Sequence, residues 1–223
     1  MSQTVTKLTA SSLAALLCAR ICHDLVSPVG ALTAALEVFD DENSMDMRED
    51  AIALIKLSAG QASAKLQFLR LAFGAGGSAP GIIPTSELKT LAMGVFGDGK
   101  AEIIWDTQAS GLDKTAARLL LNLIMLGVQA VPRGGSVTVN AVSTAENSEI
   151  NIICTGDKSR LADTVVKTLA GGAPEDGFDG RSVQPFYAGL IAREVGGKAS
   201  ASMEGDTVTF TASLPNTSGE TSA

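Results

Sequence analysis

The sequence predicts an α+β protein in which an N-terminal helical hairpin precedes an α/β sandwich domain. Two long runs of apolar residues repeat at helical spacing, a stretch rich in Gly, Ser, Ala and Pro follows them, and short helical and strand-like segments alternate over the rest. We therefore place the hairpin at residues 1–74, the linker at 75–81, the second domain at 82–215 and a disordered tail at 216–223.

The first helix is predicted over Thr9 to Asp40. Its apolar residues recur at steps of three, four and seven, and they are Leu13, Leu17, Ile21, Leu25, Leu32, Leu36 and Phe39. A second helix is predicted to start near Asp46, because Asp46 and Glu49 resemble a capping box, and to end at Gly74. Its predicted inner face consists of Ile52, Ile55, Ala59, Ala62, Leu66, Leu69 and Phe73.

The two helices carry more apolar surface than a lone hairpin buries. Leu54, Leu57, Phe68 and Leu71 add to the stripes on the second helix. We therefore expect a second copy of the chain to complete the core of the hairpin.

The second domain is predicted to be a mixed sheet with helices on one face. Helical spacing predicts helices near residues 85–96, 114–131, 159–169 and 183–195. Alternation predicts strands at 102–106, 136–142 and 149–154 and a β-hairpin over 198–214.

Composition excludes several classes of protein. With 17 basic and 24 acidic side chains the chain has a net charge of −7, the wrong sign for a phosphate backbone, and it has no basic stripe, so we expect no nucleic acid partner. The apolar stretch Leu13 to Cys18 is interrupted by Arg20, His23 and Asp24, so we expect no membrane span. No export signal is recognisable, so a cytoplasmic location is expected.

His23 is the single histidine of the chain. At about 100° per residue it lies roughly 120° to 220° from the apolar stripe of the first helix, so it is predicted to face away from the core. Mostly small residues share its side of the helix, which leaves room for another surface to approach. From this part of the helix we assign a docking surface to Ala19, Arg20, Ser27, Gly30 and Ala34.

One interpretation of His23 is a surface histidine without a role; the other is a reactive imidazole. The string His23-Asp24-Leu25-Val26-Ser27-Pro28 resembles the H-box of sensor histidine kinases. That resemblance implies that His23 accepts a phosphoryl group and that Asp24 orients the ring or takes its proton, although a solvated surface acid is as compatible with the sequence. An imidazole with a pKa near ~6.5 is largely neutral in the cytoplasm, so one ring nitrogen carries a lone pair.

Residues 116–139 resemble the N-box helix and following strand of the Bergerat, GHKL-like ATPase fold, and residues 188–198 and 207–215 resemble its second Gly-rich box and last strands. The nucleotide site is degenerate. Leu126 stands where ATP-binding members carry a magnesium-binding asparagine, and a leucine does not bind a metal. Thr155 stands at or near the position of the adenine-reading acid. We therefore expect no cofactor of its own, and no metal site at Cys18 and Cys22.

A hairpin with an H-box, joined to a degenerate Bergerat domain, is similar to the ChpT-type histidine phosphotransferases. The resemblance implies a homodimer with a four-helix bundle, which accepts phosphoryl from the receiver domain of a hybrid histidine kinase of CckA type. It would pass the group to response regulators of CtrA and CpdR type, with magnesium supplied by the partner receiver domain. Two alternatives stay open: an ATP-dependent sensor histidine kinase, and a non-catalytic dimeric scaffold that binds response regulators.

Overall fold

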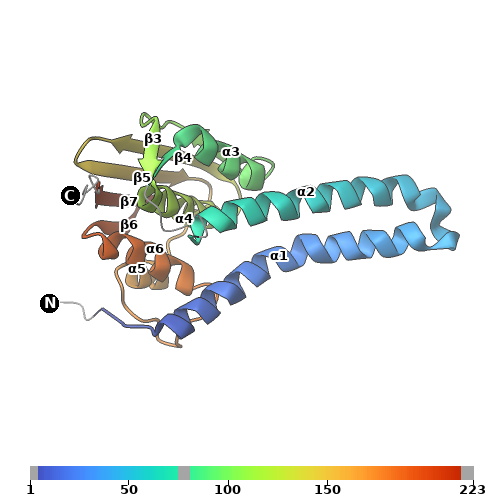
Figure 1. The fold of residues 1–223 in the computed structure, drawn as a ribbon, viewed down its shortest axis with the longest axis horizontal. Coiled ribbons are helices and arrows are strands. Elements are labelled where there is room, and N and C mark those ends of the chain that lie inside the picture. The colour runs from blue at the N-terminus through green and yellow to red at the C-terminus, as the bar shows by residue number, and fades with distance from the viewer. Residues whose placement is uncertain (1–4, 75–80, 217–223) are drawn as a thin grey trace, which may run out of the picture.

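The computed structural model describes residues 5–74 and 81–216, and the predicted linker and tail lie outside these ranges except for Gly81 and Asn216. A long helical hairpin projects from a domain of helices and strands (Figure 1). The hairpin consists of α1 (Ala10–Asp40), the 3-10 helix η1 (Glu42–Met47) and α2 (Arg48–Ala72). The predicted fold class, a hairpin followed by an α/β sandwich, is confirmed.

The turn of the hairpin differs from the prediction. Asp41 accepts a hydrogen bond from the backbone N–H of Asn43 at 3.0 Å, and this bond lowers the pKa of the Asp41 carboxyl. Asp41 is the N-cap residue of η1, so Asp46 lies inside that 3-10 helix and does not begin α2. The N-cap residue of α2 is Met47, whose side chain makes no capping hydrogen bond. The capping box predicted from Asp46 and Glu49 is therefore wrong.

Small side chains separate the two long helices. The buried residues of this contact recur seven apart on each helix, and they are Pro28 and Ala35 on α1 and Ala51 and Ser58 on α2. Ile52 and Leu66, which were predicted to face inward, are 38% and 52% exposed. The hairpin thus packs closely through small residues and leaves large apolar side chains outside.

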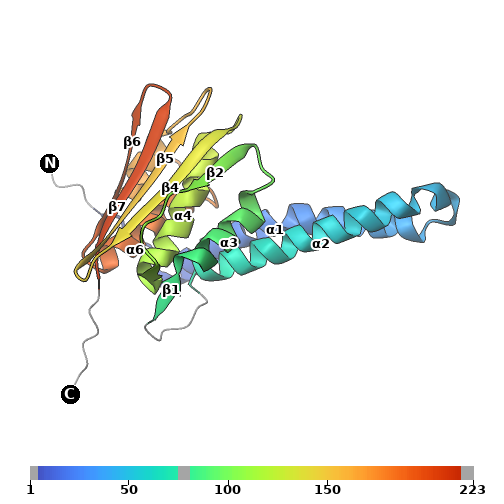
Figure 2. The same ribbon diagram turned by 90° about the horizontal axis from the view of Figure 1, so that it is seen from above.

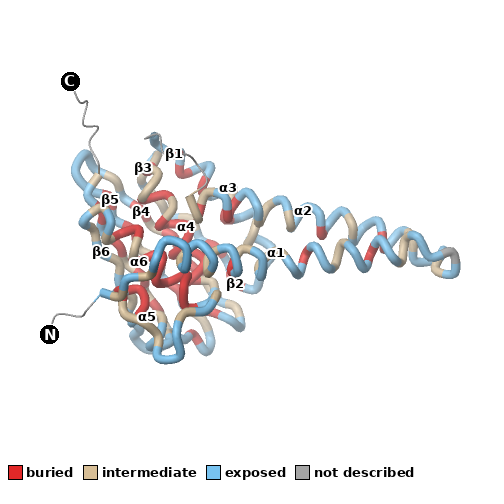
Figure 3. Tube along the Cα trace, turned by 60° about the horizontal axis from the view of Figure 1, so that its bottom comes forward, coloured by how far each residue is buried: buried red, intermediate tan, exposed pale blue. Residues whose placement is uncertain are grey.

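By length and apolar composition alone, α1 is also long and apolar enough to cross a membrane. It carries Arg20, His23 and Asp24, and it lies along α2 for much of its length (Figure 1). Figure 3 shows that both hairpin helices are largely exposed, whereas buried residues concentrate in the second domain. The apolar side chains of α1 are therefore only partly covered by the contact with α2.

The second domain has two layers, with the helices between the sheet and the hairpin (Figure 2). The sheet has the order β2-β4-β5-β7-β6, formed by Ala101–Trp105, Gly135–Ser143, Asn147–Thr155, Thr207–Pro215 and Lys198–Glu204. β2 and β4 are parallel and the other neighbours are antiparallel, so the mixed sheet is confirmed. The helices are α3 (Thr85–Phe96), α4 (Lys114–Ala130), α5 (Asp163–Leu169) and α6 (Val183–Glu194).

Three details of this domain were not predicted. β1 (Ile82–Pro84) pairs with β3 (Gly111–Asp113), and three-residue strands are too short to show alternation. α5 begins at residue 163 instead of 159, because the backbone N–H of Arg160 donates to Ala130 O at 2.9 Å and holds this segment in a loop. Asn216, predicted as tail, donates to the carbonyl of Thr144 at 2.6 Å.

The end of the hairpin is bound to α3 and α4. Phe68 is 1% exposed and packs edge-on against Phe96, with ring centroids 5.4 Å apart. The buried Asn122 on α4 donates through Nδ2 to the carbonyl of Ala72 at 2.8 Å, which satisfies one of the free carbonyls at the end of α2. Phe68, predicted as surplus apolar surface for a second copy, therefore belongs to the junction between the two domains.

Candidate functional site

His23 lies on the outer side of α1, with 71% of its side chain exposed. The predicted orientation away from the core is confirmed. Ala19, Ser27, Gly30 and Ala34 are exposed as well. A Cβ atom added to Gly30 would meet no described atom within 4 Å. This face of α1 is therefore open to the approach of another molecule.

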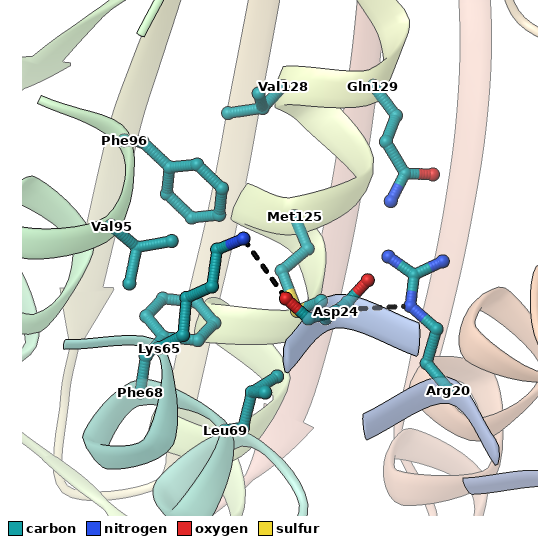
Figure 4. A pocket seen from close by; sticks show the side chains of 10 residues that line it. All are labelled: Arg20, Asp24, Lys65, Phe68, Leu69, Val95, Phe96, Met125, Val128 and Gln129. Atoms are coloured by element: carbon teal, nitrogen blue, oxygen red, sulfur yellow. Dashed lines mark hydrogen bonds and ion pairs between the residues drawn. The ribbon is translucent and has the colours of Figure 1, made fainter. Parts of the chain in front are cut away.

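Arg20 departs from the predicted docking surface. Its side chain is only 11% exposed, and its Nε donates to Oδ2 of Asp24 at 3.0 Å. The guanidinium lies over the groove between the hairpin and the second domain (Figure 4). Arg20 thus differs from the exposed residues of the predicted docking surface, because its long side chain extends toward Asp24, one turn further along the helix, and its contact with a receiver stays a prediction.

Asp24 also contacts His23, and it therefore links Arg20 to the imidazole. Its Oδ1 lies 3.2 Å from Nδ1 of His23, and its side chain is 18% exposed. An ionised carboxylate only accepts hydrogen bonds, so a neutral ring paired with it would carry its proton on Nδ1 and its lone pair on Nε2. Of the two roles that the sequence left open, this geometry favours orientation of the ring over a solvated surface acid.

Pro28 has no N–H to bond the carbonyl of Asp24 one turn earlier. Lys65 of α2 takes that place, since its Nζ donates to Asp24 O at 3.1 Å (Figure 4). The unpaired carbonyl follows from the sequence, but its partner 41 positions away does not. Sequence reasoning therefore missed Lys65.

A groove of about 210 Å³ lies beside Asp24, between the hairpin and the second domain (Figure 4). Arg20, Asp24 and Lys65 supply its polar atoms from the hairpin. Its other lining residues are Phe68, Leu69, Val95, Phe96, Met125, Val128 and Gln129. The charged groups next to His23 thus lie against largely apolar walls.

The position where the Bergerat fold carries a magnesium-binding asparagine offers no oxygen ligand in this chain, because Leu126 occupies it. Leu126 is 3% exposed and lines a cavity of about 280 Å³ that has no carboxylate among its lining residues. Thr155 Oγ1 lies 3.0 Å from Thr207 Oγ1, so a hydroxyl pair occupies the end of β5. Magnesium prefers carboxylate and phosphate oxygens, and the cavity at Leu126 has none. The carboxylates nearby line the adjoining hollow, which shares Gln129 and Arg181 with this cavity, and they are Asp163, Glu175, Asp176 and Asp179.

In the Gly-rich loop before α6, residues 171–182, two backbone donors are bound by a carboxylate. Asp179 Oδ1 accepts from the backbone N–H groups of Arg181 and Ser182, at 3.0 and 2.7 Å, and from Ser182 Oγ at 2.6 Å. The hydrogen bonds from Ser182 lower the pKa of the Asp179 carboxyl. A carboxylate therefore takes the donors that a phosphate cradle would need.

Fold and site define a helical hairpin that carries an exposed histidine and is attached to a domain of helices on a mixed five-stranded sheet. The family model described as the histidine phosphotransferase C-terminal domain matches residues 85–207. Protein phosphotransferase ChpT of Brucella abortus (strain 2308) is 42% identical over 212 residues, which cover 95% of this chain and 100% of the relative. The chain belongs to the ChpT-type histidine phosphotransferases.

One solved structure agrees with this assignment. A structure described as a bacterial phosphotransferase matches with a TM-score of 0.82 and 38% identity, over 94% of this chain and 100% of the other. The histidine kinase ThkA, in complex with the response regulator protein TrrA, matches at a TM-score of 0.48 and 14% identity, over 93% of this chain and 63% of the other.

Proposed function

We propose that this protein relays phosphoryl groups between receiver domains through His23, without using ATP. The donor would be the receiver of a hybrid histidine kinase of CckA type, and the acceptors would be response regulators of CtrA and CpdR type. One observation carries the proposal: an exposed imidazole whose Nδ1 lies 3.2 Å from Oδ1 of Asp24, which leaves Nε2 as the nitrogen available to attack.

The transfer is a substitution at phosphorus. Nε2 of His23 attacks the phosphorus of the receiver's aspartyl phosphate; a P–N bond forms as the P–O bond breaks, and the aspartate leaves as a carboxylate. The ring gains positive charge while Nδ1 keeps its proton, and the Asp24 carboxylate stabilises that charge. Magnesium supplied by the receiver would neutralise the phosphoryl oxygens, and transfer to the next receiver reverses the same step.

The small residues around His23 support a docking role. Ala19, Ser27, Gly30 and Ala34 form an exposed, low-relief strip beside the ring. Phosphoryl transfer needs the attacking and leaving atoms in line, which bulky side chains at these positions would obstruct. The strip is therefore the surface on which we place the receiver domain.

The source of the phosphoryl group tests the proposed function. We expect purified protein to become labelled on histidine when mixed with a phosphorylated hybrid-kinase receiver, and to stay unlabelled with labelled ATP and magnesium alone. The label is followed by gel autoradiography, with its acid lability as the mark of phosphohistidine. Label from ATP without a partner would establish the sensor kinase instead, and no label from any receiver would establish the scaffold.

We further propose that the protein is a homodimer with a four-helix bundle. The large exposed apolar side chains of the hairpin include Leu36, Ile52, Leu54, Leu57 and Leu66, between 38% and 55% exposed. A hollow of about 420 Å³ between the helices is lined by Ile21, Leu66 and Phe73, among others. On α2, Leu54 and Leu57 lie on one side of the contact with α1, and Ile52 and Leu66 lie on the other. Monomers rarely leave this much apolar side chain in water, and a second hairpin of the same kind would cover part of it.

Light scattering tests the dimer. We expect a mass twice the 22.8 kDa of one chain, and a dissociation constant raised at least about 100-fold by Leu57→Asp, because each copy would lose about 1.5–3 kcal/mol of apolar burial. Arg133→Asp introduces the same side chain at an exposed position in the turn after α4, outside the hairpin, and should leave the dimer intact. A monomeric mass for the unmodified protein would refute the bundle.

A further inference from the structure

We propose that Arg20 is a positioning residue that controls His23 through Asp24. The proposal rests on the proposed function of His23 as phosphoacceptor. It assigns a role in the transfer to a side chain that itself touches neither the phosphoryl group nor the imidazole.

The carboxylate of Asp24 is held at both oxygens. Arg20 Nε donates to Oδ2 at 3.0 Å, while His23 Nδ1 lies 3.2 Å from Oδ1. With both oxygens engaged, rotation of the carboxylate breaks one of the two bonds. Without Arg20, Asp24 is free to rotate, and Oδ1 no longer has a fixed position beneath the ring.

The surroundings of the ion pair strengthen it. The Arg20 and Asp24 side chains are 11% and 18% exposed, and the groove beside them has mainly apolar walls. Charge-assisted hydrogen bonds are stronger, and salt screens them less, when water is largely excluded. The loop before α6 also lies close to α1 here, since a Cβ on Gly180 would be 3.8 Å from the Cα of Arg20.

Helix stabilisation alone does not explain the pair. A basic residue four positions before an acidic one is the less favourable order along a helix, because it opposes the helix dipole. The order does, however, place the carboxylate next to His23 and the guanidinium one turn behind it. The arrangement suits the orientation of the histidine better than the stability of α1.

Lys65 completes the restraint from the other helix. Its bond to the carbonyl of Asp24 fixes the backbone at the position where Pro28 removes the usual helical bond. Arg20 therefore orients the side chain of Asp24, while Lys65 holds its backbone.

The consequence is a particular tautomer of His23. In free histidine the proton prefers Nε2, which would block the nucleophilic nitrogen. An aligned Asp24 reverses that preference by accepting a hydrogen bond from Nδ1–H. We infer that Arg20 keeps the nucleophilic tautomer populated in the resting protein.

Nitrogen-15 NMR reads this tautomer directly, because His23 is the single imidazole in the chain. At a pH where the ring is neutral, we expect Nδ1 to be protonated in the unmodified protein and both tautomers to be populated in Arg20→Gln. Arg20→Lys, which keeps the charge but not the geometry, should lie between them. Arg133→Gln removes an exposed arginine from the turn after α4 and should match the unmodified protein.

Transfer kinetics supply the second readout. We expect Arg20→Gln to slow labelling from a phosphorylated receiver by about 10- to 100-fold, and to add no further loss in an Asp24→Asn background, since its effect passes through Asp24. If the tautomer and the transfer rate are both unchanged in Arg20→Gln, the role of Arg20 is refuted, although label on His23 would still support the proposed function. If the unmodified protein accepts no label, the proposed function is refuted. The role of Arg20 in setting the tautomer is then still tested, because the NMR measurement needs no partner.

Discussion

Replacement of His23 by glutamine is expected to abolish phosphoryl transfer, with a loss of label of at least about 1000-fold. Glutamine has no nucleophilic ring nitrogen, and the chain contains no second histidine to replace it. Because the side chain is 71% exposed and makes one hydrogen bond, the free energy of unfolding should change by no more than about 0.5 kcal/mol. Autoradiography of the receiver reaction and urea unfolding measure the two effects.

Cys22→Ser is the matched control for this variant. Cys22 is exposed and precedes His23 in α1, so its replacement perturbs the same turn and leaves the imidazole in place. We expect it to accept label at the rate of the unmodified protein. Label that persists on His23→Gln would place the phosphoacceptor elsewhere in the chain.

Gly189→Ala is expected to destabilise the second domain by about 3 kcal/mol. A Cβ at this position of α6 would lie 1.9 Å from the carbonyl oxygen of Leu169 and 2.6 Å from Nη1 of Arg193. That nitrogen donates to Leu169 O at 2.7 Å, so the methyl group would also break the bond between α6 and the end of α5. A backbone carbonyl does not yield as a flexible side chain does, which makes the overpacking costly.

Gly60→Ala is the opposite case on α2. A Cβ there meets no described atom within 4 Å, so the alanine should stabilise the helix by roughly 0.5–1 kcal/mol. Urea unfolding of both variants at one protein concentration, followed by circular dichroism, gives the comparison. Equal effects of the two substitutions would contradict the close packing of α6 on α5.

The elements with strong local patterns were predictable from the sequence. The long stripes of the hairpin placed α1 and α2 to within a few residues, and alternation placed the strands of the large sheet. The outward orientation of His23 followed from helical geometry alone, because one angle per residue is enough to find the side of a helix. The small strands β1 and β3 carry too few residues for any period.

The missed features depend on contacts between distant segments. Helical angles placed Arg20 near the docking strip, but they do not show where a long side chain ends. Phe68 was predicted to be surplus apolar surface, because the sequence does not show that it packs against Phe96 of α3. Lys65 was missed because nothing local in the sequence links it to the carbonyl of Asp24.

The attachment of α2 to α4 has a consequence for recognition. Asn122 holds the last turn of the hairpin from within the second domain, and Phe68 is locked against α3 beside it. The strip around the imidazole and the neighbouring helices of the second domain are thus presented in one preset arrangement. A receiver domain that binds there would lose little binding free energy to ordering the hairpin against the second domain. Weak and short-lived complexes would therefore be enough for the proposed phosphoryl transfer.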